Sequence, residues 1–324
     1  MSETYSAQKL TFDSHEVIRL SDAAHGMEVS IVPSIGNNAY DVRVNGKPIV
    51  MAPPPFAEWK QKKSQAGIPF LAPWANRLDG DAYWANGKRY LVDPGAAEIR
   101  RDLDGQPIHG LLLFAAGWQV AALQADSLAA EVTSRLEFWR HPEWMAQFPF
   151  AHTVEMTHRL SGGILEVRTA IENHSNDPMP LVVGFHPWYQ IPEIPRDRWS
   201  VHLPVHEHYT LSAKVIPTGE TTPVDLPDPT PLAGRQVDDV FGGVDANSEF
   251  WLEADGRRVS VRFGPKFPIA IVYAPQTREV VCFEPMTGLT NGFNLAHEGI
   301  FKNLQSIPAG ATWTESFWIR PSGF

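Results

Sequence analysis

The sequence has a single cysteine, no long hydrophobic run and fewer basic than acidic side chains. Because Cys282 has no partner cysteine, an intramolecular disulfide is excluded, and its place in the apolar run VVCF predicts a buried strand thiol rather than a nucleophile. The N-terminal MSETYSAQKL lacks the apolar core of a signal peptide, and apolar runs such as residues 269–274 are too short to cross a bilayer. We therefore expect a cytoplasmic protein without a membrane partner.

The charge balance restricts the kind of partner. The 324 residues include 27 Lys and Arg against 37 Asp and Glu, a formal net charge of −10, which disfavours a polyanion such as nucleic acid. A chain of this length can bury a sizeable core without disulfides or metals. Its 28 prolines and 24 glycines indicate a globular protein with many turns. We expect one domain over residues 1–324, and the composition leaves the oligomeric state open.

Several common catalytic motifs are also absent. The sequence contains no glycine-rich phosphate loop, no HExxH, no paired CxxC and no GxSxG. His206 and His208 alternate on one expected strand face, but no carboxylate or cysteine accompanies them at a metal-like spacing. We therefore expect neither a metal site nor a cofactor.

Alternation of apolar and polar residues is the dominant pattern in what remains. Residues 153–160 alternate, residues 161–163 read SGG, and residues 165–171 alternate again, which predicts a β-hairpin. No sustained helical period and no fixed repeat accompany this pattern. We therefore predict a mainly β fold without a long helix. Weaker alternations occur at residues 27–31, 40–44, 201–205, 259–263 and 269–273.

Three segments are harder to assign. Residues 115–136 are alanine-rich and compatible with a helix, but the apolar spacing favours strand, which is our interpretation. Residues 52–65 and 217–234 are proline-rich and predict long loops. The second of these could mark a domain boundary, but strand patterns resume on both sides of it.

One histidine stands out within the segment LVVGFHPWYQIP at residues 181–192. His186 follows an apolar, strand-like run in which Gly184 permits a close backbone approach, and Pro187 prevents a helix from starting there. Such an imidazole, beside Trp188 and Tyr189, can donate a proton in a pocket that also stacks a flat ligand face. The alternative is a core histidine bonded to a backbone carbonyl.

Further polar groups lie among rigid turn residues. Arg77, which follows Asn76 in GIPFLAPWANRL, can hold a ligand through its planar guanidinium or form a surface ion pair. His109 precedes Gly110, whose small size lets another group approach closely, although a simple turn histidine fits equally well.

Acidic candidates occur in two later stretches. The segment VDDVF at residues 237–241 contains Asp238 and Asp239, either of which can be a ligand or a loop cap. Glu284 follows a buried-looking strand and precedes a proline, so we expect a partly desolvated carboxylate at a strand end. A solvated strand end is the alternative.

Together and in this order, these stretches resemble the aldose 1-epimerase (galactose mutarotase) family, from about residue 15 to residue 320. The HPW and EPMTG stretches are the more specific ones. The matching residues are NR at Asn76 and Arg77, HG at His109 and Gly110, FP at Phe148 and Pro149, NHSNDPMPLVVGFHPW at residues 173–188, DDVF at residues 238–241 and EPMTGLTNGFN at residues 284–294.

The resemblance implies a fold and a chemistry. The fold is an all-β supersandwich of two large twisted antiparallel sheets with a sugar cleft. The reaction is the interconversion of the α and β anomers of an aldose, in which Glu284 acts as base and His186 as acid without a cofactor. Both groups can cycle near neutral pH, because burial raises a carboxyl pKa and an imidazole titrates there already.

The same resemblance implies which residues hold the sugar. Arg77, with Asn76 beside it, His109 and an aspartate of the DDVF stretch would bind the hydroxyls. The spacing to Phe241 favours Asp238 over Asp239. Aromatic residues would offer the apolar sugar face a platform; the candidates are Trp188, Tyr189 and Trp74.

We expect the substrate to be a neutral aldose. The GIP at residues 67–69 looks like the RGGIP segment of the glucose-6-phosphate 1-epimerases, but Gln65 and Leu113 occupy the positions of two arginines of those enzymes. A phosphate needs such charge-assisted donors. In the alternative, loop cations supply the phosphate site; the candidates are Lys62, Lys63, Arg100 and Arg101.

Two other functions remain possible at this level. A non-catalytic sugar-binding protein could keep the fold and the cleft, but it has no need for both His186 and Glu284. A glycoside hydrolase could pair Asp238 with Glu284 as its carboxylates. That reading leaves His186 without a task, and we rank it last.

Overall fold

The computed structural model describes residues 4–324. Within these residues the chain consists mainly of strands, and its longest helix has seven residues. Neighbouring strands pair antiparallel, which confirms the all-β supersandwich expected from the sequence. No helix in this part of the chain is both long and apolar enough to cross a membrane.

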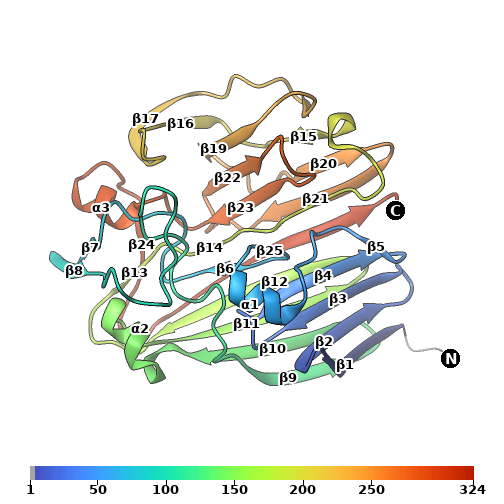
Figure 1. The fold of residues 1–324 in the computed structure, drawn as a ribbon, viewed down its shortest axis with the longest axis horizontal. Coiled ribbons are helices and arrows are strands. Elements are labelled where there is room, and N and C mark those ends of the chain that lie inside the picture. The colour runs from blue at the N-terminus through green and yellow to red at the C-terminus, as the bar shows by residue number, and fades with distance from the viewer. Residues whose placement is uncertain (1–3) are drawn as a thin grey trace.

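A nine-stranded sheet forms one layer and extends from β9 near the bottom to β15 near the top of the view (Figure 1). Its strand order is β18-β15-β20-β21-β25-β12-β11-β10-β9. The bounds are β9 (Gln119–Ala125), β10 (Ala130–Glu137), β11 (His152–Ser161), β12 (Ile164–Asn173), β15 (Ser200–His202), β18 (Thr230–Pro231), β20 (Phe250–Ala254), β21 (Arg257–Phe263) and β25 (Thr312–Ser322).

Two further sheets cover this layer and together form the second one. A seven-stranded sheet of order β17-β16-β19-β22-β23-β14-β6 lies over one half, and a five-stranded sheet, β1 to β5 in order, lies over the other. The seven strands are β6 (Phe70–Leu71), β14 (Gly184–Phe185), β16 (Glu207–Leu211), β17 (Pro217–Pro223), β19 (Val237–Gly242), β22 (Ile269–Ala274) and β23 (Cys282–Met286). The five are β1 (Tyr5–Phe12), β2 (His15–Asp22), β3 (Met27–Val32), β4 (Asn38–Val44) and β5 (Lys47–Pro48).

Short elements connect the sheets. Two small strand pairs and five short helices lie in these connections. They are β7 (Ala82–Ala85) with β8 (Lys88–Leu91), β13 (Met179–Leu181) with β24 (Gln305–Ile307), α1 (Phe56–Lys62), α2 (Pro142–Gln147), α3 (Gly292–His297), η1 (Phe138–Arg140) and η2 (Arg196–Arg198).

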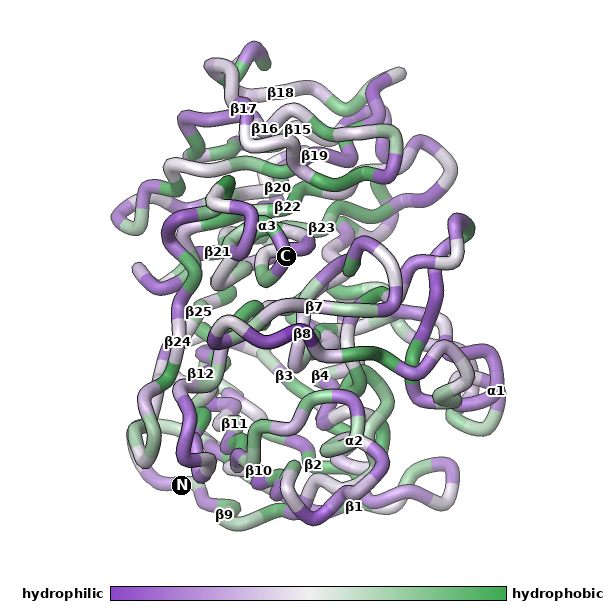
Figure 2. The backbone as a smooth tube through the Cα atoms, turned by 90° about the vertical axis from the view of Figure 1, so that its left-hand side faces the viewer, coloured by the Kyte–Doolittle hydropathy of each residue, from purple (hydrophilic) through white to green (hydrophobic). Residues whose placement is uncertain are grey.

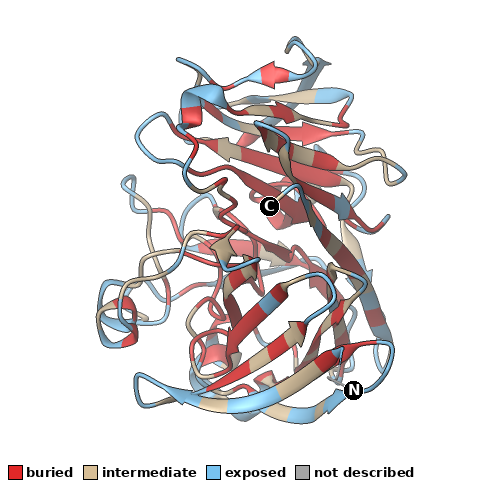
Figure 3. Cartoon of the chain, turned by 90° about the vertical axis from the view of Figure 1, so that its right-hand side faces the viewer, coloured by how far each residue is buried: buried red, intermediate tan, exposed pale blue. Residues whose placement is uncertain are grey.

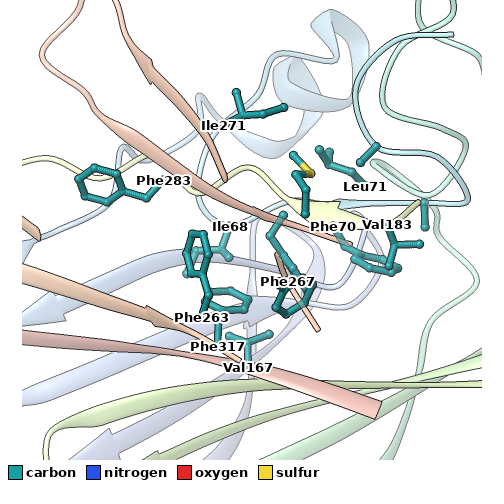
Figure 4. Close-up of a cluster of buried hydrophobic side chains, with 14 of the residues drawn as sticks. Ile68, Phe70, Leu71, Val167, Val183, Phe263, Phe267, Ile271, Phe283 and Phe317 are labelled. Carbon is teal, nitrogen blue, oxygen red and sulfur yellow. The ribbon is translucent and has the colours of Figure 1, made fainter. Parts of the chain in front are cut away.

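The core lies between the two layers. The ring centroids of Phe185 on β14 and Phe317 on β25 are 4.8 Å apart, and those of Phe250 on β20 and Phe283 on β23 are 5.5 Å apart. Figure 4 shows such side chains filling the space between facing strands. Each fully buried phenylalanine contributes roughly 1.5–3 kcal/mol through its apolar surface. Burial of these aromatic side chains therefore holds the sheet that carries β14 and β23 in place.

Hydropathy and burial follow the pleat of the strands. The colour alternates along many strands in Figure 2, as expected when side chains point in turn to the core and to solvent. The central strands are mainly buried in Figure 3. The edge strands β9 and β17 are mostly exposed.

The predicted hairpin is confirmed as β11 and β12. Ser161 pairs with Ile164, so Gly162 and Gly163 form a two-residue loop. Both glycines have positive φ, 58° and 69°, and a tight hairpin turn of this kind requires such angles at both positions. The strand interpretation of residues 115–136 is confirmed by β9 and β10.

Two loop predictions were wrong, and one strand prediction was confirmed only in part. The loop expected at residues 52–65 contains α1, because Phe56 and Trp59 bury their rings and anchor one helical face. The loop expected at residues 217–234 contains β17 and β18. Both are edge strands, where prolines remove no hydrogen bond between strands. The alternation at residues 201–205 yields only β15, since Pro204 has no N–H to continue the pairing.

Candidate functional site

A cavity of about 380 Å³ opens on the seven-stranded sheet, over its central strands β19, β22 and β23. Most of its lining side chains are polar or charged. The lining consists of Ser64, Gln65, Asn76, Arg77, Arg100, Ile108, His109, His186, Trp188, Asp238, Ile271, Tyr273, Arg278 and Glu284.

Strand register explains why distant residues meet in this cavity. Asp238 on β19 is paired with Tyr273 on β22, and Ile271 is paired with Glu284 on β23. Directly paired residues share a face, as do residues two apart on a strand. All four side chains therefore point to one face of the sheet. Phe283 points to the other face, where it meets Phe250 of the nine-stranded sheet.

His186 reaches the same face from β14. Gly184 is paired with Met286, which lies two residues after Glu284 on β23. The pair requires a glycine, because an added Cβ at Gly184 would lie 2.1 Å from the Met286 sulfur and 2.6 Å from the Pro285 carbonyl oxygen. The close approach expected of Gly184 is thus present, and it brings His186 beside Glu284.

His186 and Glu284 form a buried acid–base pair in the cavity wall. Their Nε2 and Oε1 atoms are 3.3 Å apart, and the two side chains are only 9% and 2% exposed. Glu284 lies in the middle of β23 rather than at a strand end, so the expected partial desolvation is replaced by full burial. The strand continues through Pro285 to Met286, which is paired with β14.

Burial shifts the pKa values of both groups toward their uncharged forms. Burial, and to a lesser degree the charge of Asp238, raise the pKa of Glu284 well above its usual 4.5, while Arg77 acts in the opposite direction. The pKa of His186 is lowered to about 3, mainly by burial; a backbone hydrogen bond acts in the opposite direction and the charge of Arg100 adds to the lowering. Burial therefore favours a protonated carboxyl beside a neutral imidazole.

Stacking fixes the orientation of the His186 ring. The Trp188 ring lies parallel to it at 4.9 Å with an interplanar angle of 7°. The His109 ring meets it edge-on, 5.5 Å between centroids and 82° between planes. Burial, and then the charges of His186, Arg100 and Arg77, lower the pKa of His109 well below 6.5. Both histidines are thus held as neutral imidazoles.

Arg77 is oriented by two side-chain acceptors. Its Nε donates to Asp102 Oδ2 at 2.7 Å, and its Nη1 donates to Asn76 Oδ1 at 3.0 Å. Asn76 and His109 both have positive φ, 57° and 65°, and the His109 N–H donates to the Asn76 carbonyl oxygen at 2.9 Å. Left-handed backbone at non-glycine residues costs free energy and is concentrated at functional sites.

The two adjacent aspartates lie on opposite faces of β19. Asp238 lines the cavity, where burial and the charge of Asp239 raise its carboxyl pKa and Arg77 lowers it. Asp239 is outside the cavity and lies 3.0 Å from His208 Nε2. The alternation of strand side chains thus favours Asp238, the register that the spacing to Phe241 suggested.

The sequence missed Tyr273 and Arg278, named Arg100 only as an alternative cation, and proposed two residues that lie elsewhere. All three of these polar residues line the cavity. Tyr273 belongs to a predicted strand, but its partner Asp238 cannot be recognised without the register. Trp74 and Tyr189, predicted as stacking platforms, are fully buried outside the cavity lining, because their rings belong to the core.

No cluster of three or more His, Cys, Asp or Glu side chains is arranged to hold a metal within residues 4–324. The polar groups that line the cavity are instead hydrogen-bond donors and acceptors. They consist of two imidazoles, two carboxyl groups, a phenol, two amides, a serine hydroxyl and three guanidinium groups. Such a set can transfer protons to and from a polyhydroxy compound.

The sequence is similar to a known protein family and to a curated protein. The family model described as aldose 1-epimerase matches residues 16–320. The curated Escherichia coli (strain K12) protein named uncharacterized protein YphB is 21% identical over 262 residues, which cover 77% of this chain and 82% of that protein.

Solved structures show the same architecture. A galactose mutarotase-like protein from Clostridium acetobutylicum is similar with a TM-score of 0.88 at 20% identity, over 100% of both chains. A galactose 1-epimerase from Lactobacillus acidophilus is similar with a TM-score of 0.75 at 13% identity, over 98% of this chain and 99% of that one. At these identities the likeness shows the fold.

Proposed function

The chain belongs to the aldose 1-epimerase family, and we propose that it interconverts the α and β anomers of an aldose by opening and closing the sugar ring. The observation that carries this proposal is the pairing of Glu284 with His186, 3.3 Å apart in the wall of a cavity large enough for a monosaccharide. Because each anomer must lose one proton and gain another, one acid and one base are what the reaction needs.

Glu284 and His186 together accept and supply all the protons that the reaction moves. Glu284 accepts the proton of the O1 hydroxyl while His186 delivers a proton to the ring oxygen. The bond between C1 and the ring oxygen breaks, and O1 becomes the oxygen of an aldehyde. Rotation about the bond between C1 and C2 presents the other aldehyde face. The ring oxygen then attacks C1, and the two protons return to their starting groups.

The protons bound to Glu284 and His186 suit both directions of the anomer interconversion. A protonated carboxyl beside a neutral imidazole contains the same protons as a carboxylate beside an imidazolium, and the two forms differ by one transfer over 3.3 Å. The nearby charge of Arg77 favours the ionised carboxylate. Sugar hydroxyls that donate to the carboxylate would favour it further, since hydrogen bonds to a charged form stabilise that form.

The remaining lining residues would bind the sugar. Arg77, held by Asn76 and Asp102, has donors left for a hydroxyl or for the oxygen that gains negative charge. His109 and Asp238 would bind further hydroxyls from opposite walls. Trp188 offers a flat apolar surface next to His186. A protein that only binds sugars would gain nothing from burying a carboxyl group against an imidazole, because that burial costs free energy.

Substitution of the pair tests the proposal. We expect Glu284→Gln and His186→Asn each to slow mutarotation by about 10²–10⁴-fold, since each removes a proton-transfer group with little change in volume. The measurement is the optical rotation of freshly dissolved α-D-glucose and α-D-galactose, with the spontaneous rate subtracted. Asp239→Asn is the matched control, because it alters a carboxylate on the opposite face of β19 and should leave the rate unchanged. If either variant keeps more than about a tenth of the wild-type rate, its residue is not the proton-transfer group.

A further inference from the structure

The cavity contains three arginines, and only one of them is paired with a carboxylate. Arg77 binds Asp102. Arg100 and Arg278 have no carboxylate within salt-bridge distance among residues 4–324. Both therefore present guanidinium groups to the cavity that no carboxylate of the described residues pairs with, an arrangement that suits an anionic ligand.

Of the two arginines, Arg100 gives the stronger evidence for a ligand. Its Nη1 atom is buried and lacks a hydrogen-bond partner among the described residues, and burial lowers the pKa of its guanidinium. A buried charged donor without a partner costs free energy, and an anionic ligand would supply the missing acceptor. Its backbone holds the position, because the Arg100 carbonyl oxygen accepts from the Ile108 N–H at 2.9 Å, next to His109.

Arg278 lines the cavity from a segment that is far from Arg100 in the sequence. It is exposed, and its guanidinium carbon lies 5.7 Å from the centre of the Trp188 ring, which stacks on His186. The charge of Arg100 acts on His186 directly. Both arginines therefore line the same cavity as the Glu284–His186 pair.

The carboxyl groups of the cavity do not balance these charges. Asp238 and Glu284 are the acidic side chains in the lining. Burial favours the uncharged form of Glu284, and burial also raises the carboxyl pKa of Asp238, while the charge of Arg77 lowers it. The cavity thus carries an excess of positive charge in an acidic protein.

We propose that the cavity takes an aldose with an anionic substituent, a phosphate or a carboxylate, and that Arg100 is the residue that binds this group. Arg278 contributes a second positive charge at the exposed side. Guanidinium groups bind both anions through paired, charge-assisted hydrogen bonds. This inference rests on the proposed interconversion of anomers and specifies its substrate class.

The proposal replaces the neutral aldose expected from the sequence. That expectation relied on Gln65 and Leu113 in place of two arginines. Gln65 does line the cavity, whereas Leu113 is buried outside it. Arg100, one of the alternative loop cations, lines the cavity from a different segment, and Arg278 adds a second guanidinium that no sequence motif indicated.

A comparison of substrates tests the inference. Mutarotation rates would be measured for glucose and galactose, for glucose 6-phosphate and for glucuronate and galacturonate, at one ionic strength. We expect kcat/KM for at least one anionic aldose to exceed that of its neutral parent by about tenfold or more. The phosphate and carboxylate arms identify which anion is preferred. Equal values for anionic and neutral sugars would overturn the proposal.

Arg100 provides the test variant, and its sequence neighbour Arg101 provides the control. Arg100→Gln should reduce kcat/KM for the preferred anionic aldose about tenfold more than for its neutral parent. General effects on the reaction centre cancel in this ratio. Arg101→Gln should leave the ratio unchanged, because Arg101 donates to Asp81 at 2.7 Å and to the Gly105 carbonyl oxygen at 2.6 Å, outside the cavity. Equal losses on both sugars in Arg100→Gln would contradict the assignment.

A binding measurement separates this inference from the proposed function. Calorimetric titration of Glu284→Gln with glucose 6-phosphate, glucuronate and glucose needs no turnover. We expect the anionic ligand to bind about tenfold tighter than glucose and to lose that advantage when Arg100→Gln is added. If no sugar is turned over by the wild type but this difference persists, the proposed reaction fails and the anion site stands. If turnover occurs but the difference is absent, the anion site fails and the reaction stands.

Discussion

At the scale of residues, the main feature is a carboxyl and an imidazole buried together. Isolated, either group would resist burial in its charged form. Their contact at 3.3 Å lets one proton satisfy both, so the pair titrates as a unit whose two pKa values lie far apart. The singly protonated pair is then the form present over a wide pH range.

This separation predicts an unusual pH profile. The second proton binds only as the pH approaches the lowered His186 pKa of about 3, and the single proton leaves only above the raised pKa of Glu284. We therefore expect kcat/KM to stay constant as the pH is lowered through 6.5, the usual pKa of histidine. Mutarotation rates between roughly pH 5 and 8, corrected for the spontaneous reaction, check this.

The control is His208→Asn, which removes a histidine outside the cavity and should give the same profile. An acidic limb with its midpoint near 6.5 in the wild type would contradict the expectation, because it would show that His186 titrates as an ordinary imidazole.

The sequence could predict some of these residues and not others. His186, Glu284 and Arg77 lie in stretches that resemble the family, and the structure brings all three to one cavity. Arg100 and Arg278 lie in loops without a distinctive motif. Their approach to His186 depends on how those loops fold against the sheet, which no local pattern in the chain encodes.

At the scale of elements, the backbone segments around Ala72 and His109 position Arg77 and the cavity histidines. The segment after His109 packs on Ala72, whose carbonyl oxygen accepts from the N–H groups of Leu111 and Leu112 at 2.7 and 3.1 Å. Gly110 has φ +65°, and an added Cβ there would lie 2.1 Å from the Ala72 oxygen. This contact allows no side chain, so Gly110 sets the distance between the two segments.

We expect Gly110→Ala to slow mutarotation by about 10²-fold, because displacement of catalytic-site groups by about 1 Å has effects of that size. Gly80→Ala is the control. Gly80 also has positive φ, +80°, but no atom lies within 4 Å of its added Cβ, so it shares the backbone strain without the collision. Rates by polarimetry and melting temperatures would be measured for both. Equal rates in the two variants would show that Gly110 does not position the site.

Element prediction from the sequence succeeded where a local rule acts alone. Alternation identified β11 and β12, and two glycines supplied the turn between them. It failed where long-range contacts decide the conformation. Helix α1 forms because Phe56 and Trp59 find a buried surface on other parts of the chain, and β17 forms because an edge position accepts its prolines.

At the scale of the whole molecule, the site depends on the packing of two layers. The cavity occupies the outer face of the seven-stranded sheet, whose inner face packs on the nine-stranded sheet. Phe185 belongs to that inner packing and is followed directly by His186. Stability of the core and geometry of the site are thus coupled through one strand. This coupling supports the proposal that residues 1–324 form a single domain.

The substitution Phe317→Ala tests this coupling. Phe317 is fully buried and its ring lies 4.8 Å from that of Phe185, so its truncation should lower the free energy of unfolding by about 3–5 kcal/mol. Guanidinium unfolding, followed by fluorescence and circular dichroism, measures this loss. Leu128→Ala, at a position 67% exposed, is the control and should change it by less than about 0.5 kcal/mol. If the chain is one domain, both probes will report a single transition that moves to lower denaturant. A second transition that keeps its wild-type midpoint would instead show that part of the chain folds independently of this core.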